Sequence, residues 1–518
     1  MRRWSWAFAS WLIGTVASAD TFEITEGMDL RSVLSDLSAG DEVVIHEGRY
    51  VTGGRWGFAW NGTEEMPIVV RGADGEARPV IEGNRSQNVM DLDGSYFELR
   101  GLEIVGGSHG VRLGVVDHAV LEDLRIHDVA DVGISCNRGG GGSDCAALVI
   151  RRNEIFDTGV GGDTGEGMYL GCNGDDCRIY DSVIELNYVH DTRAGSQGDG
   201  IELKYGSYGN LVRDNVIVRT KYPGILVSSF PAMAGRRPNV IERNLVWDAD
   251  DNGIQLGGQA IVRNNIVLGA GNSGIQAQPS RNAAGEAVRT VDAVVLHNTV
   301  VNGSGTCFRG NEWITGLRNV LANNAFYCAE GTAIRWGGGE PEAAQAVLVG
   351  NIVLGGGGGR GARAGVGVAE DLGDPSGGRV YPPAGSALVD AADPAHAAAD
   401  DFNGDPRDDG APDVGAYERS AARNPGWPLG EGFKDAPSDP SPADAGTPSS
   451  DAGGSDGGAA GPDVGVRDAA GAPMDAGGAD AGRGEAGGGC ACSAVAPADG
   501  VAPLLLLAFF AGRRRHGR

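Results

Sequence analysis

The chain has 518 residues and is acidic, with 69 aspartates and glutamates against 42 lysines and arginines and a formal net charge of −27. This balance leaves no basic surface for a phosphate backbone and argues against nucleic acid as a partner. It does not exclude acidic polysaccharides, because acidic sites can recruit them through Ca²⁺. Length alone would allow about three domains of about 150 residues each.

Residues 1–19 have the pattern of a secretion signal. Two arginines precede an apolar run over residues 4–16, and Ala17-Ser18-Ala19 provides a cleavage site before Asp20. The run is too short to span a membrane. We therefore expect an exported protein whose mature chain begins near Asp20, and export permits disulfides.

A short amphipathic helix is predicted at the start of the folded region. Leu30, Val33, Leu34 and Leu37 fall on one helical face, and a strand-forming stretch follows over residues 40–50. A repeat fold needs such an N-terminal cap, because its first coil would otherwise expose an unpaired sheet edge.

From residue 153 onward the sequence repeats one phrase, an Asn followed by apolar residues, at steps of 21 to 34 residues. A second phrase, Gly followed by Ile or Met, keeps step with it. Strand-forming residues and a repeat of this length predict a solenoid. Two or three short strands per turn make an all-β parallel β-helix, expected from about residue 42 to 355. The repeated residues are Asn153, Asn187, Asn215, Asn244, Asn265, Asn298, Asn324 and Asn351, and Gly133, Gly167, Gly200, Gly224, Gly253 and Gly274.

The repeated Asn is expected at a corner of each coil, where it would tolerate a left-handed backbone. Stacked on its neighbours, it would form a ladder whose side-chain amides bond along the axis. Toward the N-terminal end, Leu102 and Leu124 take the place of the Asn.

Alternation along a strand predicts which side chains point out of each coil. Ile201 and Leu203 are expected to point inward, so that Glu202 and Lys204 project onto the surface. Stacking the repeats places Tyr169 in the same outward column as Glu202.

Three carboxylates are predicted to meet on this outward surface. Adjacent coils lie about 4.8 Å apart, so Glu166, Asp199 and Glu202 would form a cluster of like charge that needs a cation or a shared proton. We predict that they bind a divalent cation, with Ca²⁺ as the expected cofactor. A solvated acidic face is the alternative. Further candidate ligands in adjoining loops are Asp163, Asp175 and Asp176.

Lysine is rare in this chain, because only three of its 42 cationic residues are lysines. A lysine retained where arginine is the usual cation hints at a compact amine that can lose its proton. Lys204, together with Glu202, is therefore a candidate catalytic residue. The alternative is that Lys204 is only an ion-pair partner of Glu202.

A sugar-binding groove is predicted beside the acidic cluster. Tyr169, Arg193, Tyr205 and Lys221 are its candidate residues, because aromatic rings stack on sugars and cations pair with carboxylates. They are equally ordinary as surface residues. Among the histidines, only His190 is kept as a candidate for catalysis.

Six cysteines lie in the folded part of the chain. Proximity in sequence suggests the pairs Cys136 with Cys145, Cys172 with Cys177 and Cys307 with Cys328. Six cysteines allow 15 connectivities, and stacking of coils could instead bring Cys136 near Cys172. A zinc site is the other alternative, but no histidine lies close in sequence to these cysteines.

The C-terminal part changes composition. Residues 390–418 are interpreted as the last coil or as a C-terminal cap, and the folded domain is expected to span residues 20–419. Residues 420–489 are rich in Ala, Gly, Asp and Pro and predict a disordered, charged linker. Residues 490–518 contain Cys490 and Cys492, a short apolar run and a terminal arginine cluster, which would stay on the cytoplasmic side of a membrane.

These features resemble two known families. Residues 21–419 resemble the superfamily of right-handed parallel β-helix proteins that includes pectate, alginate and chondroitin lyases and rhamnogalacturonan hydrolases. Its lyases remove the proton beside a uronate carboxylate with a Lys or Arg base, which implies that role for Lys204. The tail resembles the sorting tail of myxobacterial surface proteins, which implies cleavage near Cys490 or, alternatively, retention as a membrane anchor.

Three functions follow as hypotheses. The first is a monomeric, surface-attached polysaccharide lyase that acts on uronate-containing glycans through Glu166, Asp199, Glu202 and Lys204. The second is a non-catalytic adhesin or glycan-binding protein. The third is a glycoside hydrolase, which needs two well-placed carboxylic acids rather than a lysine.

Overall fold

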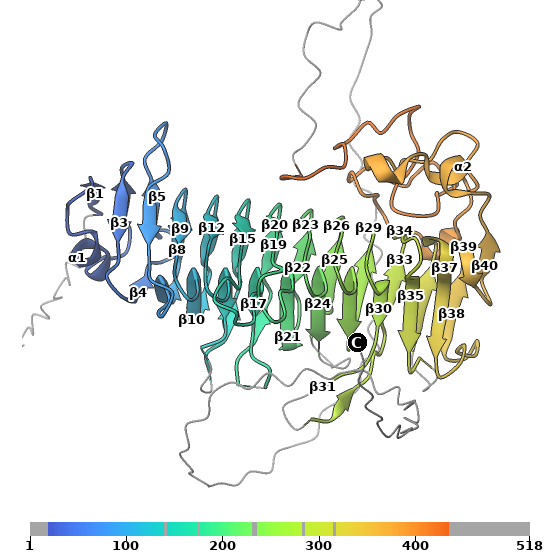
Figure 1. Cartoon of the computed structure of the whole chain (residues 1–518), viewed down its shortest axis with the longest axis horizontal. Coiled ribbons are helices and arrows are strands. Elements are labelled where there is room, and N and C mark those ends of the chain that lie inside the picture. Colours follow the sequence, from blue (N-terminus) through green and yellow to red (C-terminus); the bar gives the residue numbers. More distant parts are fainter. Residues whose placement is uncertain are drawn as a thin grey trace, which may run out of the picture. The chain divides into compact units, whose positions relative to one another are not determined.

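A computed structural model of the chain describes residues 19–138, 142–174, 176–229, 236–281, 285–313 and 318–434. Within this part of the chain, short parallel strands stack in rows, one coil after another, from residue 21 to residue 364 (Figure 1). The predicted all-β parallel β-helix is therefore confirmed. It begins with a strand at residues 21–24, ahead of the expected start at residue 42.

One face of each coil is a 13-stranded parallel sheet. Its strands are β1 (Thr21–Ile24), β2 (Glu42–Ile45), β5 (Ile68–Gly72), β8 (Phe97–Arg100), β11 (Val120–Glu122), β15 (Val149–Arg151), β19 (Val183–Glu185), β22 (Leu211–Arg213), β25 (Asn239–Glu242), β28 (Ala260–Arg263), β33 (Val294–Leu296), β36 (Asn319–Ala322) and β38 (Ala346–Val349).

The other two faces join into a 25-stranded sheet because the long strand β37 (Ala325–Gly337) runs across both. We call one of them the site face. Its strands are β4 (Trp56–Asn61), β7 (Met90–Ser95), β10 (Val111–Asp117), β13 (Ile134–Cys136), β17 (Met168–Leu170), β21 (Ile201–Ser207), β24 (Ile225–Ser229), β27 (Ile254–Gly257), β30 (Ser273–Ala277) and β35 (Thr306–Asn311), flanked by β14 (Cys145–Ala146) and β18 (Ile179–Tyr180).

We call the remaining face the capped face. Its strands are β3 (Arg49–Val51), β6 (Val80–Glu82), β9 (Glu103–Val105), β12 (Arg125–His127), β16 (Glu154–Phe156), β20 (Tyr188–His190), β23 (Val216–Val218), β26 (Leu245–Trp247), β29 (Ile266–Leu268), β34 (Thr299–Val301), β39 (Asn351–Gly357) and β40 (Ala362–Ala364). A small hairpin of β31 (Ser280–Arg281) and β32 (Ala287–Val288) lies outside the three rows.

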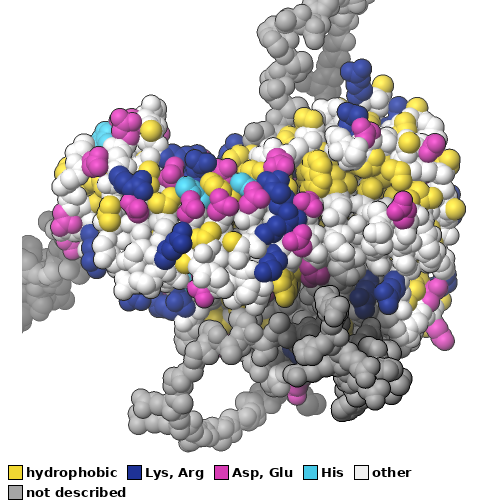
Figure 2. All heavy atoms as spheres, viewed as in Figure 1, with side chains coloured by type: hydrophobic (Ala, Val, Ile, Leu, Met, Phe, Trp, Pro, Cys, Tyr) yellow, Lys and Arg dark blue, Asp and Glu magenta, His cyan; other side chains and the backbone are white. Residues whose placement is uncertain are grey.

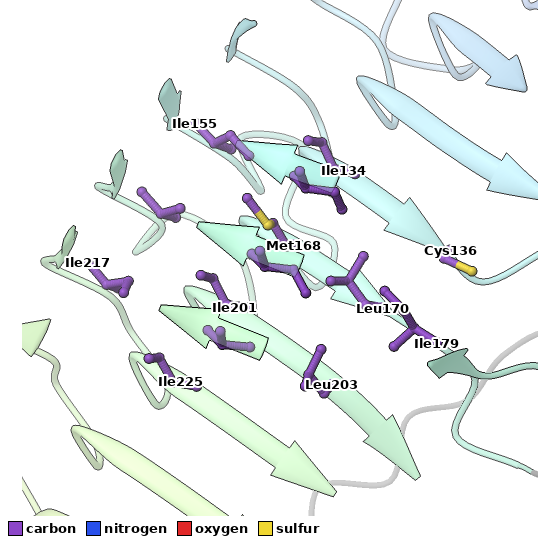
Figure 3. Packing of buried hydrophobic residues seen from close by; sticks show 14 of the residues in the cluster. Ile134, Cys136, Ile155, Met168, Leu170, Ile179, Ile201, Leu203, Ile217 and Ile225 are labelled. Atoms are coloured by element: carbon purple, nitrogen blue, oxygen red, sulfur yellow. The ribbon is translucent and has the colours of Figure 1, made fainter. Parts of the chain in front are cut away.

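The inside of the helix is filled by apolar side chains that repeat from coil to coil. On the site face, Ile134, Met168, Ile201 and Ile225 pair in register on successive strands, and each is fully buried (Figure 3). Like side chains in register pack against one another at every coil, so the hydrophobic core is continuous along the axis.

The predicted Asn ladder runs along one corner. From Asn153 to Asn351, each Nδ2 donates to the Oδ1 of the next Asn at 2.9–3.0 Å. The left-handed backbone falls on the residue before each Asn, such as Arg152 at φ 55° and Leu186 at φ 55°, rather than on the Asn itself. That neighbour turns the corner, and the Asn amide satisfies the backbone groups that the corner leaves unpaired.

A second, shorter ladder at another corner went unrecognised in the sequence. Ser182 N donates to Asn210 Oδ1 at 3.1 Å, and Asn210 Nδ2 donates to Asn239 Oδ1 at 2.9 Å. This second ladder spans only three coils, so the sequence shows no long repeat of its residues.

The N-terminal end is covered by the helix α1 (Leu30–Ser35), which lies beside the first coils (Figure 1). Leu30 and Leu34 are buried, and Trp60 Nε1 donates to the Leu34 carbonyl at 2.8 Å. The predicted helical cap is therefore present.

The chain after β40 folds back along the capped face instead of adding a coil. It contains α2 (Val368–Leu372) and the 3₁₀ turns Pro375–Gly377 and Pro394–His396. Phe402 and Tyr417 pack against strand residues such as Leu245 and Ile266 in a second hydrophobic core. This segment hides the outward apolar side chains of the last coils from water.

The folded chain continues past residue 419, where the linker was expected to begin. Lys434 is buried, and its Nζ donates to Asp214 Oδ1 at 2.8 Å and to the Phe402 carbonyl at 2.7 Å. Glu431 pairs with Arg219 at 2.5 Å. Residues 420–434 therefore belong to the cap, because these contacts hold them against the strands.

The six cysteines form three disulfides, Cys136–Cys145, Cys172–Cys177 and Cys307–Cys328. These are the pairs suggested by proximity in sequence, and not the stacked pair of Cys136 with Cys172. Each bridge closes a short segment beside the site face.

The terminal segments lie outside the described residues. This applies to the predicted secretion signal, the rest of the linker and the sorting residues Cys490 and Cys492. In the part of the chain that the structure describes, no helix is both long and apolar enough to cross a membrane.

The Asn ladder predicts a large stability effect for Asn215→Ala. Asn215 accepts from the backbone and the side chain of Asn187 and donates to the Ile184 carbonyl and to Asn244. Removing it leaves buried groups unpaired, so we expect a loss of about 3 kcal/mol in the free energy of unfolding, measured by urea denaturation. Asn272→Ala, at an exposed hydrogen bond to Asp251, is the control and should cost less than about 0.5 kcal/mol. Equal losses would contradict the role of the ladder.

Candidate functional site

Three carboxylates meet on the site face where the sequence predicted them. Glu166 lies just before β17, Asp199 just before β21, and Glu202 on β21. One oxygen from each lies within 4.8 Å of the others, and all three residues are buried. The parallel pairing of β17 with β21 produces this meeting, since it sets Tyr169 opposite Glu202 and brings the preceding turns together.

The two turns can approach closely because a glycine follows both Glu166 and Asp199. A side-chain carbon at Gly200 would lie 2.5 Å from the Gly224 carbonyl oxygen and from Ile217 Cγ2. No larger residue fits there without moving the backbone. The repeated glycine therefore sets the distance between coils at the site.

Each carboxylate has one oxygen without a partner. Glu166 Oε1, Asp199 Oδ1 and Glu202 Oε2 are buried, and no hydrogen bond reaches them within the described part of the chain. Buried carboxylate oxygens without donors are costly. Because one oxygen of each residue lies within 4.8 Å of the others, the three carboxylates fit a hard cation, and oxygen donors are what Ca²⁺ prefers.

Burial and mutual repulsion hold protons on this cluster when no cation is bound. Burial first, and then the charge of Glu202, raise the pKa of Glu166 from 4.5 to about 7. The same two causes raise the pKa of Asp199 well above its usual range. The cluster is therefore partly neutral near pH 7, and binding a cation would release protons.

A hydrogen-bonded chain leads from the cluster to His109. Thr164 Oγ1 lies 2.6 Å from Glu166 Oε2 and 2.8 Å from Asp131 Oδ1, and His109 Nε2 lies 3.3 Å from Asp131. A hydroxyl carries one proton, so it cannot donate to two carboxylates at once. A protonated Glu166 donating to Thr164, which then donates to Asp131, satisfies every contact and agrees with the raised pKa of Glu166.

Asp131 is the ionised end of this chain. Burial opposes its charge, but hydrogen bonds from His109 and Thr164 outweigh burial and lower its pKa. His109 Nδ1 also lies 2.8 Å from Ser135 Oγ. Sequence reasoning missed Asp131 and Thr164 because they lie in turns outside the outward columns of the repeat, and it did not connect His109 with the acidic cluster.

Lys204 forms an ion pair with Glu202 inside the protein. Its Nζ contacts Glu202 Oε1 and lies 4.1 Å from the centre of the Tyr169 ring. Burial alone would lower the pKa of Lys204, but the charge of Glu202 exceeds this effect and raises it above the ordinary lysine value. The amine is therefore charged while Glu202 is free to pair with it.

The expectation that Glu202 and Lys204 lie open on the surface is wrong. Their side chains are 5% and 9% exposed. Both point out of the coil, but the loop after β17, closed by the disulfide Cys172–Cys177, lies against Lys204. A side-chain carbon at Gly171 in this loop would sit 3.1 Å from Lys204 Cβ. Alternation fixes direction, whereas loops decide exposure.

The predicted sugar-binding residues are only partly brought together. Tyr169 and Tyr205 are buried on β17 and β21, and Tyr169 lies beside the cluster, in register with Glu202. Arg193 instead pairs with Asp250 at 2.7 Å, and Lys221 Nζ donates to the Gly195 carbonyl at 2.5 Å. These two cations are engaged in holding loops.

His190 lies on the capped face, away from the acidic cluster. It stacks on Phe156 with ring centres 4.8 Å apart and contacts Asp191 at 2.8 Å. The sequence places His190 on the same coil as the acids, but it did not show that the side chain lies on a different face of that coil.

The outward column through Glu202 follows the predicted register and extends further. Ser135, Tyr169, Glu202, Leu226, Gln255 and Gln276 pair in series as expected. The column then continues to Arg309 and Arg335. The sequence did not show these two because Cys307-Phe308 replaces the Gly-Ile phrase before Arg309, and Ala333-Ile334 replaces it before Arg335.

Comparison with known proteins agrees with the fold. A family model described as a right-handed β-helix region matches residues 80–277. The predicted fold, a right-handed parallel β-helix, is thus supported by both sequence and structure. Among curated proteins, none matches this chain.

Solved structures similar to this chain include polysaccharide lyases and a tailspike protein. An alginate lyase from Paenibacillus sp. str. FPU-7 is 20% identical, covers 67% of this chain and 99% of its own, and has a TM-score of 0.42. The pectate lyase Pel9A is 16% identical over 78% and 97%, with a TM-score of 0.49. The Dettilon tailspike protein is 14% identical over 57% and 62%, with a TM-score of 0.38. At these identities the likeness concerns the fold alone.

The protons held by the acidic cluster predict that stability depends on pH in opposite directions in the absence and in the presence of Ca²⁺. The folded pKa of Glu166, about 7, exceeds its ordinary value of 4.5. The folded state therefore holds a proton that the unfolded state releases, and stability without Ca²⁺ falls as pH rises from 4.5 to 7. Ca²⁺ needs the ionised carboxylates, so its stabilising effect should grow over the same window.

Melting temperatures with EDTA and with Ca²⁺, measured across this pH window, test both trends. Glu166→Gln is the matched variant, since it keeps the shape and removes the titrating group. It should flatten the pH dependence and weaken the calcium effect. A calcium effect that is absent at high pH would contradict the cation site.

Proposed function

We propose that this is an exported β-helix protein that binds acidic polysaccharide on the site face and cleaves it by β-elimination. The observation that supports this best is the set of three buried carboxylates, each with an unpartnered oxygen, next to Lys204. The fold shared with polysaccharide lyases is compatible with the proposal but does not carry it.

Glu166, Asp199 and Glu202 are the residues that would hold a Ca²⁺ ion. When bound, the ion supplies positive charge that neutralises a uronate carboxylate and eases loss of the proton from the neighbouring carbon. The protein's own contribution is to keep three oxygen donors fixed between two coils, with Thr164 bonded to the second oxygen of Glu166.

Lys204 is proposed as the base. A lysine base must be partly neutral near pH 7, against an ordinary pKa of about 10.4. Glu202 keeps it charged as long as that carboxylate is unshared. Positive charge near Glu202 would weaken this hold and lower the pKa of the amine, while the Tyr169 ring below keeps Nζ in place.

The reaction would proceed without any other reactant. The amine of Lys204 takes the proton from the carbon next to the uronate carboxylate. The electron pair left behind forms a carbon–carbon double bond, and the glycosidic carbon–oxygen bond breaks. The leaving oxygen takes a proton from water, and the hydroxide left behind takes the proton held on Lys204, so that water and the neutral amine are both restored. One product carries an unsaturated sugar at its end.

A non-catalytic glycan-binding protein or adhesin is the second candidate. The burial of Lys204 and its ion pair with Glu202 favour it, because a base must reach its substrate. In that case the cluster would hold a structural cation that stiffens the face.

The cellular location of the protein is part of the proposal. Export is supported by the signal-like residues 1–19 and by the three disulfides. Attachment to the cell surface rests on the tail around Cys490. Intact-mass analysis of protein released from cells should find a mature chain that begins near Asp20 and ends near Cys490, whereas a chain still carrying Arg518 would reject the processing of the tail.

Lys204→Ala tests the chemistry. Purified protein is incubated with polygalacturonate, alginate or chondroitin in Ca²⁺, and unsaturated products are followed by ultraviolet absorbance. Loss of the base should lower the rate by about 10²-fold to 10⁴-fold, and EDTA should have a similar effect. Lys204→Arg keeps a positive charge beside Glu202 but replaces the amine with a guanidinium of higher ordinary pKa, so its rate should fall between those of the unaltered protein and Lys204→Ala.

The outcomes separate the two candidate functions. Full activity of Lys204→Ala would refute Lys204 as the base. Absence of unsaturated product from all three polymers with the unaltered protein, despite measurable binding, would favour the non-catalytic candidate.

A further inference from the structure

Charged side chains on the 13-stranded sheet alternate in sign from coil to coil. Glu122, Arg151, Glu185, Arg213, Glu242 and Arg263 pair in register on successive strands. Arg151 Nε lies 2.8 Å from Glu122, and Arg263 Nε lies 2.8 Å from Glu242. Acidic and basic side chains are also interspersed on the surface visible in Figure 2. Each arginine in this column thus has an acid within reach.

The site face breaks this rule with two stacked arginines. Arg309 on β35 and Arg335 on β37 are directly opposite each other in the parallel register. Neighbouring strands lie about 4.8 Å apart, so two like charges face outward side by side. Like charges in this arrangement destabilise the sheet unless an anion lies between them.

Neither arginine has an ion pair or a hydrogen bond to a side chain or carbonyl in the described ranges. Arg309 Nε is buried without an acceptor, whereas Arg335 is exposed. In so acidic a chain, arginines without an acid beside them are unusual. The pair therefore has guanidinium N–H donors that an anionic ligand on this face can accept from.

The pair stands in line with the acidic cluster. The column that starts at Glu202 passes Leu226, Gln255 and Gln276 before it reaches Arg309. Four strand spacings make this about 19 Å. Between the two ends, the buried atoms Asn252 Oδ1, Ser273 Oγ and Gln276 Oε1 also lack hydrogen-bond partners in the part of the chain that the structure describes.

We propose that Arg309 and Arg335 form a separate anion-binding subsite that grips a carboxylate or sulfate group of an acidic polysaccharide lying along the site face. The planar guanidinium groups suit bidentate pairing with either group. The choice of a polysaccharide rests on the proposed function, but the grip itself needs neither a metal ion nor catalysis.

Binding in EDTA tests the subsite apart from the metal and the chemistry. Without a cation, the acidic cluster cannot attract an anionic polymer, so the arginine pair should dominate. Immobilised polygalacturonate, which carries carboxylates, and dextran sulfate, which carries sulfates, are the probes, with neutral dextran as the blank. Affinity is measured by biolayer interferometry at low and high salt, since exposed charge pairs weaken as salt rises.

Arg309→Gln and Arg335→Gln should each weaken binding about tenfold, and the double variant more. Arg309→Lys, which keeps the charge but loses the fork, should fall between. Arg318→Gln is the matched control. It removes one positive charge just before β36 of the 13-stranded sheet, where Arg318 is 88% exposed and pairs with Asp292, and binding should not change.

Three outcomes would overturn the subsite. The double variant could bind as tightly as the unaltered protein, Arg318→Gln could lose as much affinity as the arginine variants, or the unaltered protein could bind neither probe. The preference between the two probes assigns the anionic group. If the unaltered protein binds the probes through Arg309 and Arg335 but shows no lyase activity, only the proposed chemistry is contradicted.

Discussion

In this fold every side chain lies against its counterpart one coil on, because the strands pair parallel and in register. A residue type can repeat along such a column only if it is compatible with itself. Isoleucine meets this condition by packing, and asparagine meets it because one amide both donates and accepts. The buried core and the Asn ladder from Asn153 to Asn351 are the two results.

Charged groups do not meet this condition, since a carboxylate only accepts hydrogen bonds and a guanidinium only donates them. The 13-stranded sheet resolves the difficulty by alternating Glu with Arg. The site face leaves it unresolved at two places, where acids gather around Glu202 and where Arg309 faces Arg335. Both places have unpartnered polar atoms. An external ion or ligand is the physical remedy that remains.

Burial gives the acidic cluster its character. Glu166, Asp199, Glu202 and Lys204 are all buried, and this burial raises the pKa of Glu166 and Asp199 and encloses the ion pair of Lys204 with Glu202. The same burial strengthens the interaction with a cation and restricts the approach of a polymer. Catalysis and passive binding differ in which of these two effects matters more.

The sequence by itself determined the fold, the register and the meeting of Glu166, Asp199 and Glu202, because a fixed repeat converts spacing along the chain into position in space. Repeat arithmetic stops where the repeat stops. Irregular segments, whose paths depend on packing with distant residues, produce the features that the repeat does not predict. These are the loop against Lys204, the contact of Thr164 with Glu166 and the folding of residues 366–434 onto the capped face. Arg309 and Arg335 were hidden because their coils lack the Gly-Ile phrase, and only the pairing of β35 with β37 aligned them. Local sequence thus fixed the direction of each strand side chain, whereas tertiary contacts decided which were buried, protonated or left without a partner.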